Sequence, residues 1–405
     1  MQTPAQPLTH DVVIVGGGLV GASLGCALAP LIERHGLKVA IIEAAPLPAA
    51  AQPDQWQPSF DARASAIAAG SAERFHRLGV WQAMRREAAP IRRIHISERG
   101  RLGVTRLDAD DLHVDALGHV IANAWMGRVL HARLAELALD WHCPAKVAHI
   151  APTEAGHRLA LSDGSTLTAG LTVLADGGRS GLKEQLGIAS RAADYAQTAL
   201  IANVAVSEPH GGVAYERFTA DGPIALLPLS GNAMELVWTH PAGEEKARMA
   251  LSDGDFLAAL QRAFGDRAGR FTRVGKRYAY PLSLVTAEET VRPGLAVLGN
   301  AAHALHPVAG QGFNLALRGV VDLVDTLAEH LAAGGAAGDM AALSAFDRKR
   351  ARDRRDVVRF SDGLIRLFGA RLPLLPSLRA AGLAGLNLAG PLRRDVARRA
   401  MGLER

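Results

Sequence analysis

The hydrophobic positions near the N-terminus fall into two short blocks, separated by a glycine turn and a segment long enough for one helix. Residues 11–29 (DVVIVGGGLVGASLGCALA) read as a buried strand, a turn and a helix, and residues 39–43 read as a second strand. Strands that are apolar throughout, without alternation, are typical of a parallel sheet covered on both faces. The pattern therefore predicts a βαβ unit at the start of the chain.

Further along the chain, segments that predict helices alternate with segments that predict strands. Residues 64–81 predict a helix that ends at Gly79, and residues 127–139 predict another. Alternation on either side of Asp163-Gly164 predicts a β-hairpin with a tight turn. The strand-like runs within residues 195–285 predict a mainly antiparallel sheet.

The last part of the chain repeats the strand-to-helix pattern. Residues 294–331 predict a strand, a loop and a long helix, and residues 332–339 (AAGGAAGD) predict a break. The predicted fold class is α/β: a Rossmann-like domain with an inserted, mainly antiparallel sheet and a C-terminal helical segment. In residue numbers, we expect the nucleotide-binding domain at 8–70, 100–185 and 285–335, the substrate domain at 71–99 and 186–284, and the helical segment at 336–405.

Composition narrows the class of protein. The 405 residues fit two closely packed domains, and 49% hydrophobic with 21% charged residues is ordinary for a globular chain. No window of 18 consecutive apolar residues predicts a membrane span, and residues 1–10 lack the basic and apolar regions of a secretory signal. The two cysteines, Cys26 and Cys143, exclude a disulfide framework, and Cys26 is expected to be buried. We therefore expect a cytoplasmic protein.

The charge is unevenly distributed. The formal net charge is +5, yet residues 346–405 hold 15 Lys and Arg against 6 Asp and Glu. Leucines alternate with these arginines, so two interpretations stay open. The segment is either an amphipathic surface that meets a membrane or a lipid-carrying partner, or a set of helices whose leucines pack on the body. Nucleic-acid binding is disfavoured, because no aromatic residues are interleaved with the basic ones.

The first motif with chemical meaning is G-x-G-x-x-G, formed by Gly16, Gly18 and Gly21. In this pattern the glycines permit a tight turn, a close approach of the backbone to a pyrophosphate, and close packing of the helix on the strand. Glu43 follows Gly21 by 22 residues, where a carboxylate binds the ribose of a dinucleotide. Strand, helix and acid at this spacing predict a dinucleotide site.

An overlapping pattern around Ser23 matches the nucleophile elbow G-x-S-x-G. An elbow serine must lie on the sharp strand-to-helix turn itself, whereas Ser23 lies after that turn and within the predicted helix. Esterase chemistry is therefore disfavoured.

Two further motifs follow predicted strands. Asp176 and Gly177 come directly after residues 171–174, where a carboxylate and a glycine suit close contact with a dinucleotide. Asn300 follows a second strand, and residues 307–314 (PVAGQGFN) open the long helix at another anion-binding N-terminus. His303 and His306 have the spacing H-x-x-H but no third ligand nearby, so no metal site is predicted.

With these three motifs in this order, the chain resembles the flavoprotein aromatic hydroxylases of the para-hydroxybenzoate hydroxylase fold. Within that group it is similar to the ubiquinone-biosynthesis hydroxylases, through residues 61–68 (DARASAIA), 127–134 (GRVLHARL) and 299–318 (GNAAHALHPVAGQGFNLALR). The wider family has Gly-Asp where this chain has Gly-Asn at Asn300, and an arginine where it has Lys183. The subgroup tolerates the asparagine.

The resemblance implies FAD as cofactor, with NADH or NADPH as a transient reductant and molecular oxygen as co-substrate. The resemblance implies that the three glycines contact the pyrophosphate, Glu43 the ribose, and two arginines the flavin phosphates and ring. It implies that Asp176 and Gly177 lie close to both FAD and the transient nicotinamide donor, that Asn300 contacts the ribitol or the pyrophosphate, and that residues 307–314 line the flavin ring. The residues implied to bind the cofactor are Gly16, Gly18, Gly21, Glu43, Arg63, Arg128, Asp176, Gly177, Asn300, Pro307, Gly310, Gly312 and Asn314.

The implied reaction is hydroxylation of a polyprenylated phenol through a C4a-hydroperoxyflavin, in which no side chain need act as an obligatory acid or base. No catalytic residue is assigned. The alternatives are a hydroxylase of a small soluble aromatic compound, and a non-catalytic flavin-binding subunit of a biosynthetic complex. Peripheral attachment at the inner face of a membrane and homo-oligomerisation stay open. A second G-x-G-x-x-G is absent from the sequence, which argues against a reductase with two Rossmann domains.

Overall fold

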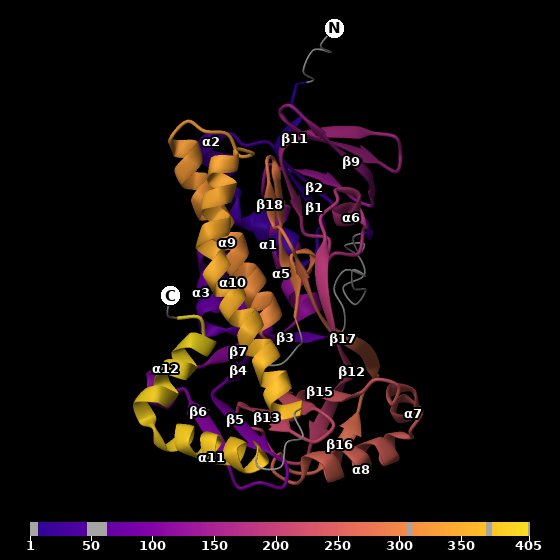
Figure 1. Ribbon diagram of the computed structural model, residues 1–405, viewed down its shortest axis with the longest axis vertical. Helices are drawn as coiled ribbons and strands as arrows, with labels where there is room; N and C mark the ends of the chain where they lie inside the picture. Colours follow the sequence, from indigo (N-terminus) through magenta and orange to yellow (C-terminus); the bar gives the residue numbers. More distant parts are fainter. Residues whose placement is uncertain (1–6, 47–62, 306–309, 370–374, 404–405) are drawn as a thin grey trace.

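The computed structural model describes residues 7–46, 63–305, 310–369 and 375–403, and it contains two large sheets joined by a small one (Figure 1). The first large sheet has the order β18-β19-β11-β1-β2-β8. Its strands are β1 His10–Val15, β2 Val39–Ile42, β8 Asp140–His142, β9 Val147–Thr153, β10 Gly156–Leu161, β11 Thr166–Leu174, β18 Val291–Arg292 and β19 Leu295–Val297. The pairings of β1 with β2 and β11, of β2 with β8, and of β11 with β19 are parallel, so the predicted βαβ unit is confirmed.

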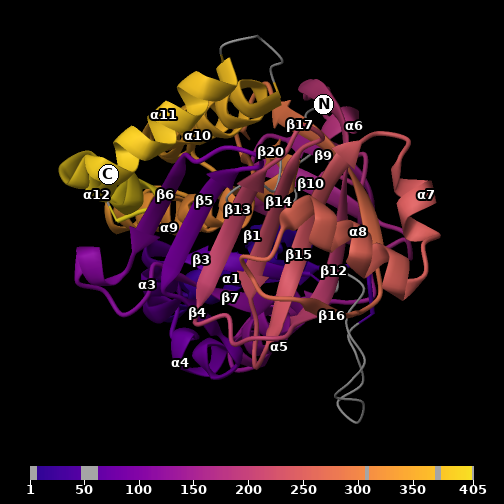
Figure 2. The ribbon, with the colours of Figure 1, turned by 90° about the horizontal axis from the view of Figure 1, so that it is seen from below.

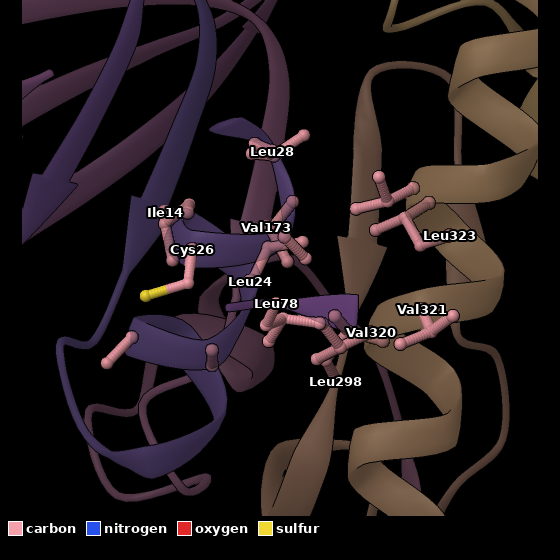
Figure 3. Packing of buried hydrophobic residues seen from close by; sticks show 14 of the residues in the cluster. Ile14, Leu24, Cys26, Leu28, Leu78, Val173, Leu298, Val320, Val321 and Leu323 are labelled. Carbon is pink, nitrogen blue, oxygen red and sulfur yellow. The ribbon is translucent and has the colours of Figure 1, made fainter. Parts of the chain in front are cut away.

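Helices cover one face of this sheet. Ile14, Leu24 and Val173 pack against Leu298 and Val320, which brings the first helix and the long helix α9 together over the sheet (Figure 3). The helices on this side and at its border are α1 Leu19–Ala27, α2 Ala29–His35, α3 Ala69–Arg77, α4 Trp81–Met84, α5 Asn123–Leu134 and α9 Gln311–Ala332. The hairpin β9–β10 and the short helix α6 (Leu182–Gln185) lie over the other side.

Cys26 belongs to this core. Its side chain is 1% exposed, and burial raises the pKa of its thiol to about 12. The thiol donates a long hydrogen bond to the carbonyl oxygen of Leu130, at 3.6 Å. The expectation of a buried cysteine is confirmed, and the residue is too basic to act as a thiolate at neutral pH.

The second large sheet has the order β20-β17-β12-β15-β14-β13-β5-β6, with β16 beside β12 (Figure 2). Its strands are β5 Arg93–Glu98, β6 Val104–Asp108, β12 Ser190–Val206, β13 Val213–Phe218, β14 Pro223–Pro228, β15 Ala233–Pro241, β16 Phe271–Val274, β17 Tyr278–Ala287 and β20 His303–Ala304. All pairings are antiparallel except that of β13 with β5, which confirms the mainly antiparallel prediction. Helices α7 Glu245–Met249 and α8 Asp253–Phe264 lie on the outer side of this sheet.

Two expected boundaries are wrong. Strand β6 was placed in the nucleotide-binding domain, but it pairs with β5 in the second sheet, because Leu107 lies opposite Ile94 across the hairpin. Helix α3 was placed in the substrate domain, but Phe75 is fully buried in the core of the first sheet and stacks on Phe313 of α9. Contacts between segments distant in sequence decide both cases.

The predicted helix at residues 64–81 is also wrong in its first part. Residues Ala64–Ala68 form strand β3, which pairs with β7 (Gly118–Ala122), while β4 (Ala89–Ile91) pairs with the other edge of β7. Helix α3 begins only at Ala69. The ladder to β7 overrides the helix propensity of this alanine-rich segment.

The C-terminal segment folds as α10 Met340–Gly369, α11 Leu375–Leu388 and α12 Gly390–Ala400. Helix α10 runs along α9, and α11 packs on the edge of the second sheet (Figure 1). The hydroxyl of Thr105 donates to the carbonyl oxygen of Leu383 at 2.7 Å, and Arg379 forms an ion pair with Glu98 at 2.6 Å. Within the described part of the chain, no helix is long and apolar enough to cross a bilayer.

A buried ionic cluster holds α9 and α10 together. Asp322, 1% exposed, accepts a hydrogen bond from Arg350 at 3.1 Å and pairs with Lys349 at 3.2 Å. Arg318 donates to Asp353 at 2.8 Å. Because buried charges are stable only when each is paired, this cluster fixes the register of the two helices.

We expect Asp322→Asn to lower the free energy of unfolding by roughly 3 kcal/mol, because it leaves the buried Arg350 guanidinium under-compensated. Asp325→Asn, one turn away on α9, removes only the exposed pair with Arg77 and should cost less than about 1 kcal/mol. Urea unfolding of both variants measures the difference. Equal losses would contradict the structural role of the cluster.

Candidate cofactor and active site

The glycine motif forms a turn that only glycine permits. Gly16 has a positive φ of 106°, and a Cβ atom there would lie 2.6 Å from the carbonyl oxygen of Ala175. A Cβ atom on Gly21 would lie 1.8 Å from the carbonyl oxygen of Gly16. The first turn of α1 therefore packs directly on the strand end, as the spacing of the motif predicts.

Gly18 differs from its neighbours, because a Cβ atom there would meet no atom within 4 Å among the described residues. The same holds for Gly312, in the first turn of α9. Gly18 is the N-cap of α1, so its backbone lies where the unpaired N–H groups of a helix attract a phosphate. No packing contact requires glycine at these two positions, and their uncovered backbone is therefore suited to contact with a ligand.

Glu43 lies directly after β2 and is 5% exposed. One carboxylate oxygen accepts from the backbone N–H of Gly17 at 2.7 Å, and the other accepts from that of Ala45 at 2.7 Å. The acid thus braces the glycine turn, in addition to the ribose contact predicted for it. His131 of α5 braces the same turn with its Nε2 2.9 Å from the carbonyl oxygen of Gly17, a contact that the sequence did not indicate.

The second motif forms a tight turn beside the first. The carboxylate of Asp176 accepts from the backbone N–H groups of Gly178 and Ser180, each at 3.1 Å. Gly177 and Gly178 have positive φ angles of 74° and 72°. A Cβ atom on Gly178 would lie 3.4 Å from the Cα atom of Ala301, so the second motif is in contact with the third.

The third motif follows β19 as a short 3-10 turn, Gly299–Ala301, in which Asn300 is exposed. Gly299 approaches α1 so closely that a Cβ atom would lie 2.9 Å from Cγ2 of Val20. Lys183, buried, donates to the carbonyl oxygen of Ala301 at 3.4 Å. The three motifs, far apart in sequence, therefore meet around the N-terminal end of α1.

Asn314 ties the start of α9 to β3. Its Oδ1 accepts from the N–H of Ala68 at 2.9 Å, and its Nδ2 donates to the carbonyl oxygens of Ala66 and Gly310 at 2.8 and 2.7 Å. Gly310 caps α9 with a φ of 60°. Pro307 and His306 lie outside the described residues.

The two predicted arginines lie on different elements. The guanidinium of Arg63 lies over the ring of Tyr280, 4.8 Å from its centroid, and the carbonyl oxygen of Arg63 accepts from Asn123 at the start of α5. Arg128 is exposed on α5 and lies 5.7 Å from the ring centroid of Trp125. Arg63 therefore marks the junction of the cofactor motifs with the second sheet, and Arg128 lies on α5 one turn before His131, which contacts the glycine turn.

Glu235 is a further residue at this junction, and it is missing from the sequence-based set. It is 2% exposed, and its Oε1 accepts from the backbone N–H of Ala64 at 2.7 Å. The sequence signal that could have indicated Glu235 is a single acidic residue within the apolar residues of β15. A carboxylate that is buried in this way needs a hydrogen-bond partner of its own.

His303 lies behind the third motif and is 7% exposed. Burial lowers the pKa of its imidazole to about 3, so the ring is neutral at physiological pH. A cavity of about 20 Å³ beside it, lined also by Thr290 and Arg350, has room for one water molecule. Among the described residues no cluster of His, Cys, Asp or Glu could hold a metal ion.

Comparison with known proteins identifies the family. A model of the FAD binding domain family matches residues 9–361. The chain is 35% identical over 397 residues to the protein named ubiquinone hydroxylase UbiL of Rhodospirillum rubrum, covering 97% of this chain and 89% of that protein. The chain belongs to the flavoprotein aromatic hydroxylases. Its subgroup includes the protein named 3-demethoxyubiquinol 3-hydroxylase of Escherichia coli, 33% identical over 97% of this chain and 98% of that one.

The fold agrees with this assignment. The crystal structure of p-nitrophenol 4-monooxygenase PnpA from Pseudomonas putida superposes with a TM-score of 0.75 at 16% identity, covering 98% of this chain and 99% of that one. At this identity the likeness establishes the fold alone. The protein is thus an FAD-dependent aromatic hydroxylase, and the bare backbone at Gly18 and Gly312 fits the cofactor of the family.

We expect Gly18→Ala to weaken FAD binding roughly tenfold while the apo-protein keeps its stability, because the added methyl group enters only the space left for the ligand. Gly363→Ala, an exposed glycine of α10 with equally open surroundings, serves as the control. Fluorescence titration with FAD measures both affinities. If Gly18→Ala binds FAD as tightly as the wild type, the cofactor does not bind at this turn.

Proposed function

We propose that this protein is an FAD- and NAD(P)H-dependent monooxygenase that hydroxylates the ring of a polyprenylated phenol in ubiquinone biosynthesis. The observation that carries the proposal is the meeting of the three motifs at two bare glycines, beside a largely apolar sheet face. The assignment to ubiquinone biosynthesis is supported by the names of the relatives.

In this proposal the chain holds the cofactor mainly with backbone. The turn at Gly18 and the N-terminus of α9 would bind the phosphate and flavin ends, and Glu43 the ribose. Bound FAD, once reduced by a nicotinamide, supplies the activation of oxygen. The protein's part is to orient the phenol and to exclude water from the reacting centre.

The face of the second sheet that turns toward β3 favours a neutral, lipophilic substrate. Ala199, Ile201, Val237 and Leu282 form its apolar cluster, with Tyr280 packed against them. The alternative substrate, a small aromatic acid, would bring a carboxylate near the buried Glu235, and like charges at close range are unfavourable. The proposal therefore favours a phenol without a carboxylate.

The assay adds a short-chain prenylated methoxyphenol to the FAD-loaded protein and follows NADH or NADPH oxidation. We expect oxidation to increase at least about tenfold over the rate without phenol, and the product to gain one oxygen atom by mass spectrometry. A small aromatic acid that stimulates better would favour the alternative substrate. Bound FAD that no phenol stimulates would favour a non-catalytic subunit.

We further propose that the C-terminal helices meet an anionic phospholipid surface, from which the substrate is collected. Phe360, Leu378 and Leu392, on α10, α11 and α12, are 51%, 65% and 55% exposed. The same helices carry most of the excess positive charge of residues 346–405. Exposed apolar side chains among arginines suit the interface of an anionic bilayer.

We expect the wild-type protein to float with phosphatidylglycerol vesicles at low salt and to be released as salt screens the charges. A triple variant, Phe360→Ser, Leu378→Ser and Leu392→Ser, should lose most of this binding. Leu8→Ser, which removes an exposed leucine outside the C-terminal helices, should keep it. Equal flotation of all three proteins would contradict the proposal.

A further inference from the structure

The second sheet carries an unpaired carboxylate on its inner face, the face turned toward β3. On β13, Tyr215 and Arg217 point to the outer side, because the ring of Phe264 of α8 lies 5.5 Å from that of Tyr215 and 5.9 Å from the guanidinium of Arg217. Side chains alternate along a strand, so Glu216 between them points inward. It has no hydrogen-bond or ion-pair partner among the described residues.

The strand register places Glu216 in a row that leads to the cofactor junction. Ala225 of β14 lies opposite Glu216, Val237 of β15 lies opposite Ala225, and Ile201 of β12 lies opposite Val237. Residues directly opposite in antiparallel strands share a face. Since neighbouring strands lie about 4.8 Å apart, Glu216 is about 10 Å from Val237 along this row, a separation comparable to the length of a phenol ring with its hydroxyl group.

Hydrogen bonds and ring contacts connect this face to β3, and through β3 to the start of α9. Glu235, two residues before Val237 on β15, accepts from the N–H of Ala64, and Arg63 lies over Tyr280. Ala66, two residues after Ala64, lies against Gly310 at the start of α9. A Cβ atom added to Gly310 would lie 3.0 Å from the Cβ atom of Ala66. A ring that rests on Val237 therefore lies between the N-terminus of α9 and Glu216.

The other charged groups on this face already have partners. Glu98 of β5 is paired with Arg379 of α11, and the carboxylate of Glu235 is held by Ala64. Beside Glu216, the neighbouring strands present Ala225 and Ile96. These apolar neighbours explain why burial raises the pKa of the Glu216 carboxyl to about 7 while some of its surface is still accessible.

We propose that Glu216 binds the hydroxyl group of the phenol and accepts its proton. The inference rests on the proposed function and deepens it, because it assigns a proton acceptor. The phenol O–H bond breaks, the proton moves to a carboxylate oxygen of Glu216, and the electron pair remains on the phenol oxygen. The phenolate that forms is a more electron-rich ring for the oxygen transfer, and no oxidation or reduction occurs in this step.

The acidity of the two groups suits the transfer. A phenol has a pKa of about 10 and an ordinary glutamate about 4.3, so an exposed carboxylate is too weak a base. A carboxyl group with a pKa of about 7 narrows the difference to about 3 and is still half ionised at neutral pH. The wild-type rate should therefore rise as pH increases through about 7, where Glu216 loses its own proton.

The test compares the wild type with Glu216→Gln, which keeps the shape and a hydrogen bond but cannot accept the proton. We expect FAD binding to be unchanged, the phenol-stimulated kcat to fall at least about 100-fold, and the rise of the rate near pH 7 to disappear. A ring-fluorinated phenol, whose hydroxyl group is more acidic, needs less help from a base and should recover part of the lost rate in the variant. Glu208→Gln, an exposed acid of the same domain, is the matched control and should behave as the wild type.

Each other outcome has a clear meaning. If Glu216→Gln turns over at the wild-type rate with the same pH profile, Glu216 is not the proton acceptor. If the variant loses FAD or unfolds, Glu216→Asp, which keeps the carboxylate, must restore the rise of the rate with pH, and its failure to do so overturns the assignment. If the phenol neither binds to nor stimulates the wild-type protein, the proposed function fails and this assignment falls with it.

Discussion

The structure depends on one close backbone contact, in which the first turn of α1 packs against the carbonyl oxygen of Gly16. This contact requires glycine at Gly21, where any side chain would overlap the carbonyl oxygen. Gly16 in turn lies against Ala175, and Gly299 lies against Val20. Because a glycine lies at each contact, three segments far apart in sequence approach one another closely, with backbone against backbone at Gly16 and Gly21 and backbone against the Val20 side chain at Gly299. The surface that results is made of N–H groups and helix ends, which suits an anionic dinucleotide better than any set of side chains would.

The parts of the fold that sequence could predict are those determined by local spacing. The glycine motif with Glu43, the turn at Asp163-Gly164 and the long helix after the third motif each depend on residues within a short window. Strand β3 was missed for the opposite reason. Its alanines favour a helix, but its conformation is determined by the ladder to β7 and by two hydrogen bonds with Asn314, which accepts from Ala68 and donates to Ala66 and lies almost 250 positions later.

The candidate site divides in the same way. Gly18 could be predicted as a candidate because it belongs to the glycine motif. Glu235 and Glu216 belong to no motif, and they lie in strands that pair with segments distant in sequence. Sequence shows each as an acid within an apolar run, but only the register of β13, β14 and β15 shows that both point toward the cofactor side. The parallel pairing of β13 with β5, which links segments over 100 residues apart, has no local signal at all.

The distribution of charge follows from what each region binds. In the proposed site, helix ends and backbone N–H groups would meet the phosphate charge of the cofactor. On the proposed substrate side, the apolar face of the second sheet carries few charges, which suits a neutral ring. The ionic cluster of Asp322 and Arg350 connects these regions, because it fixes α10 on α9. Helix α9 starts at the third motif, and Phe368 near the end of α10 stacks on Phe218 of β13, 3.5 Å between ring centroids. The helix pair thus connects the third motif to the strand that carries Glu216, and the proposed oxygen transfer to one ring position would require the distance between them to be constant.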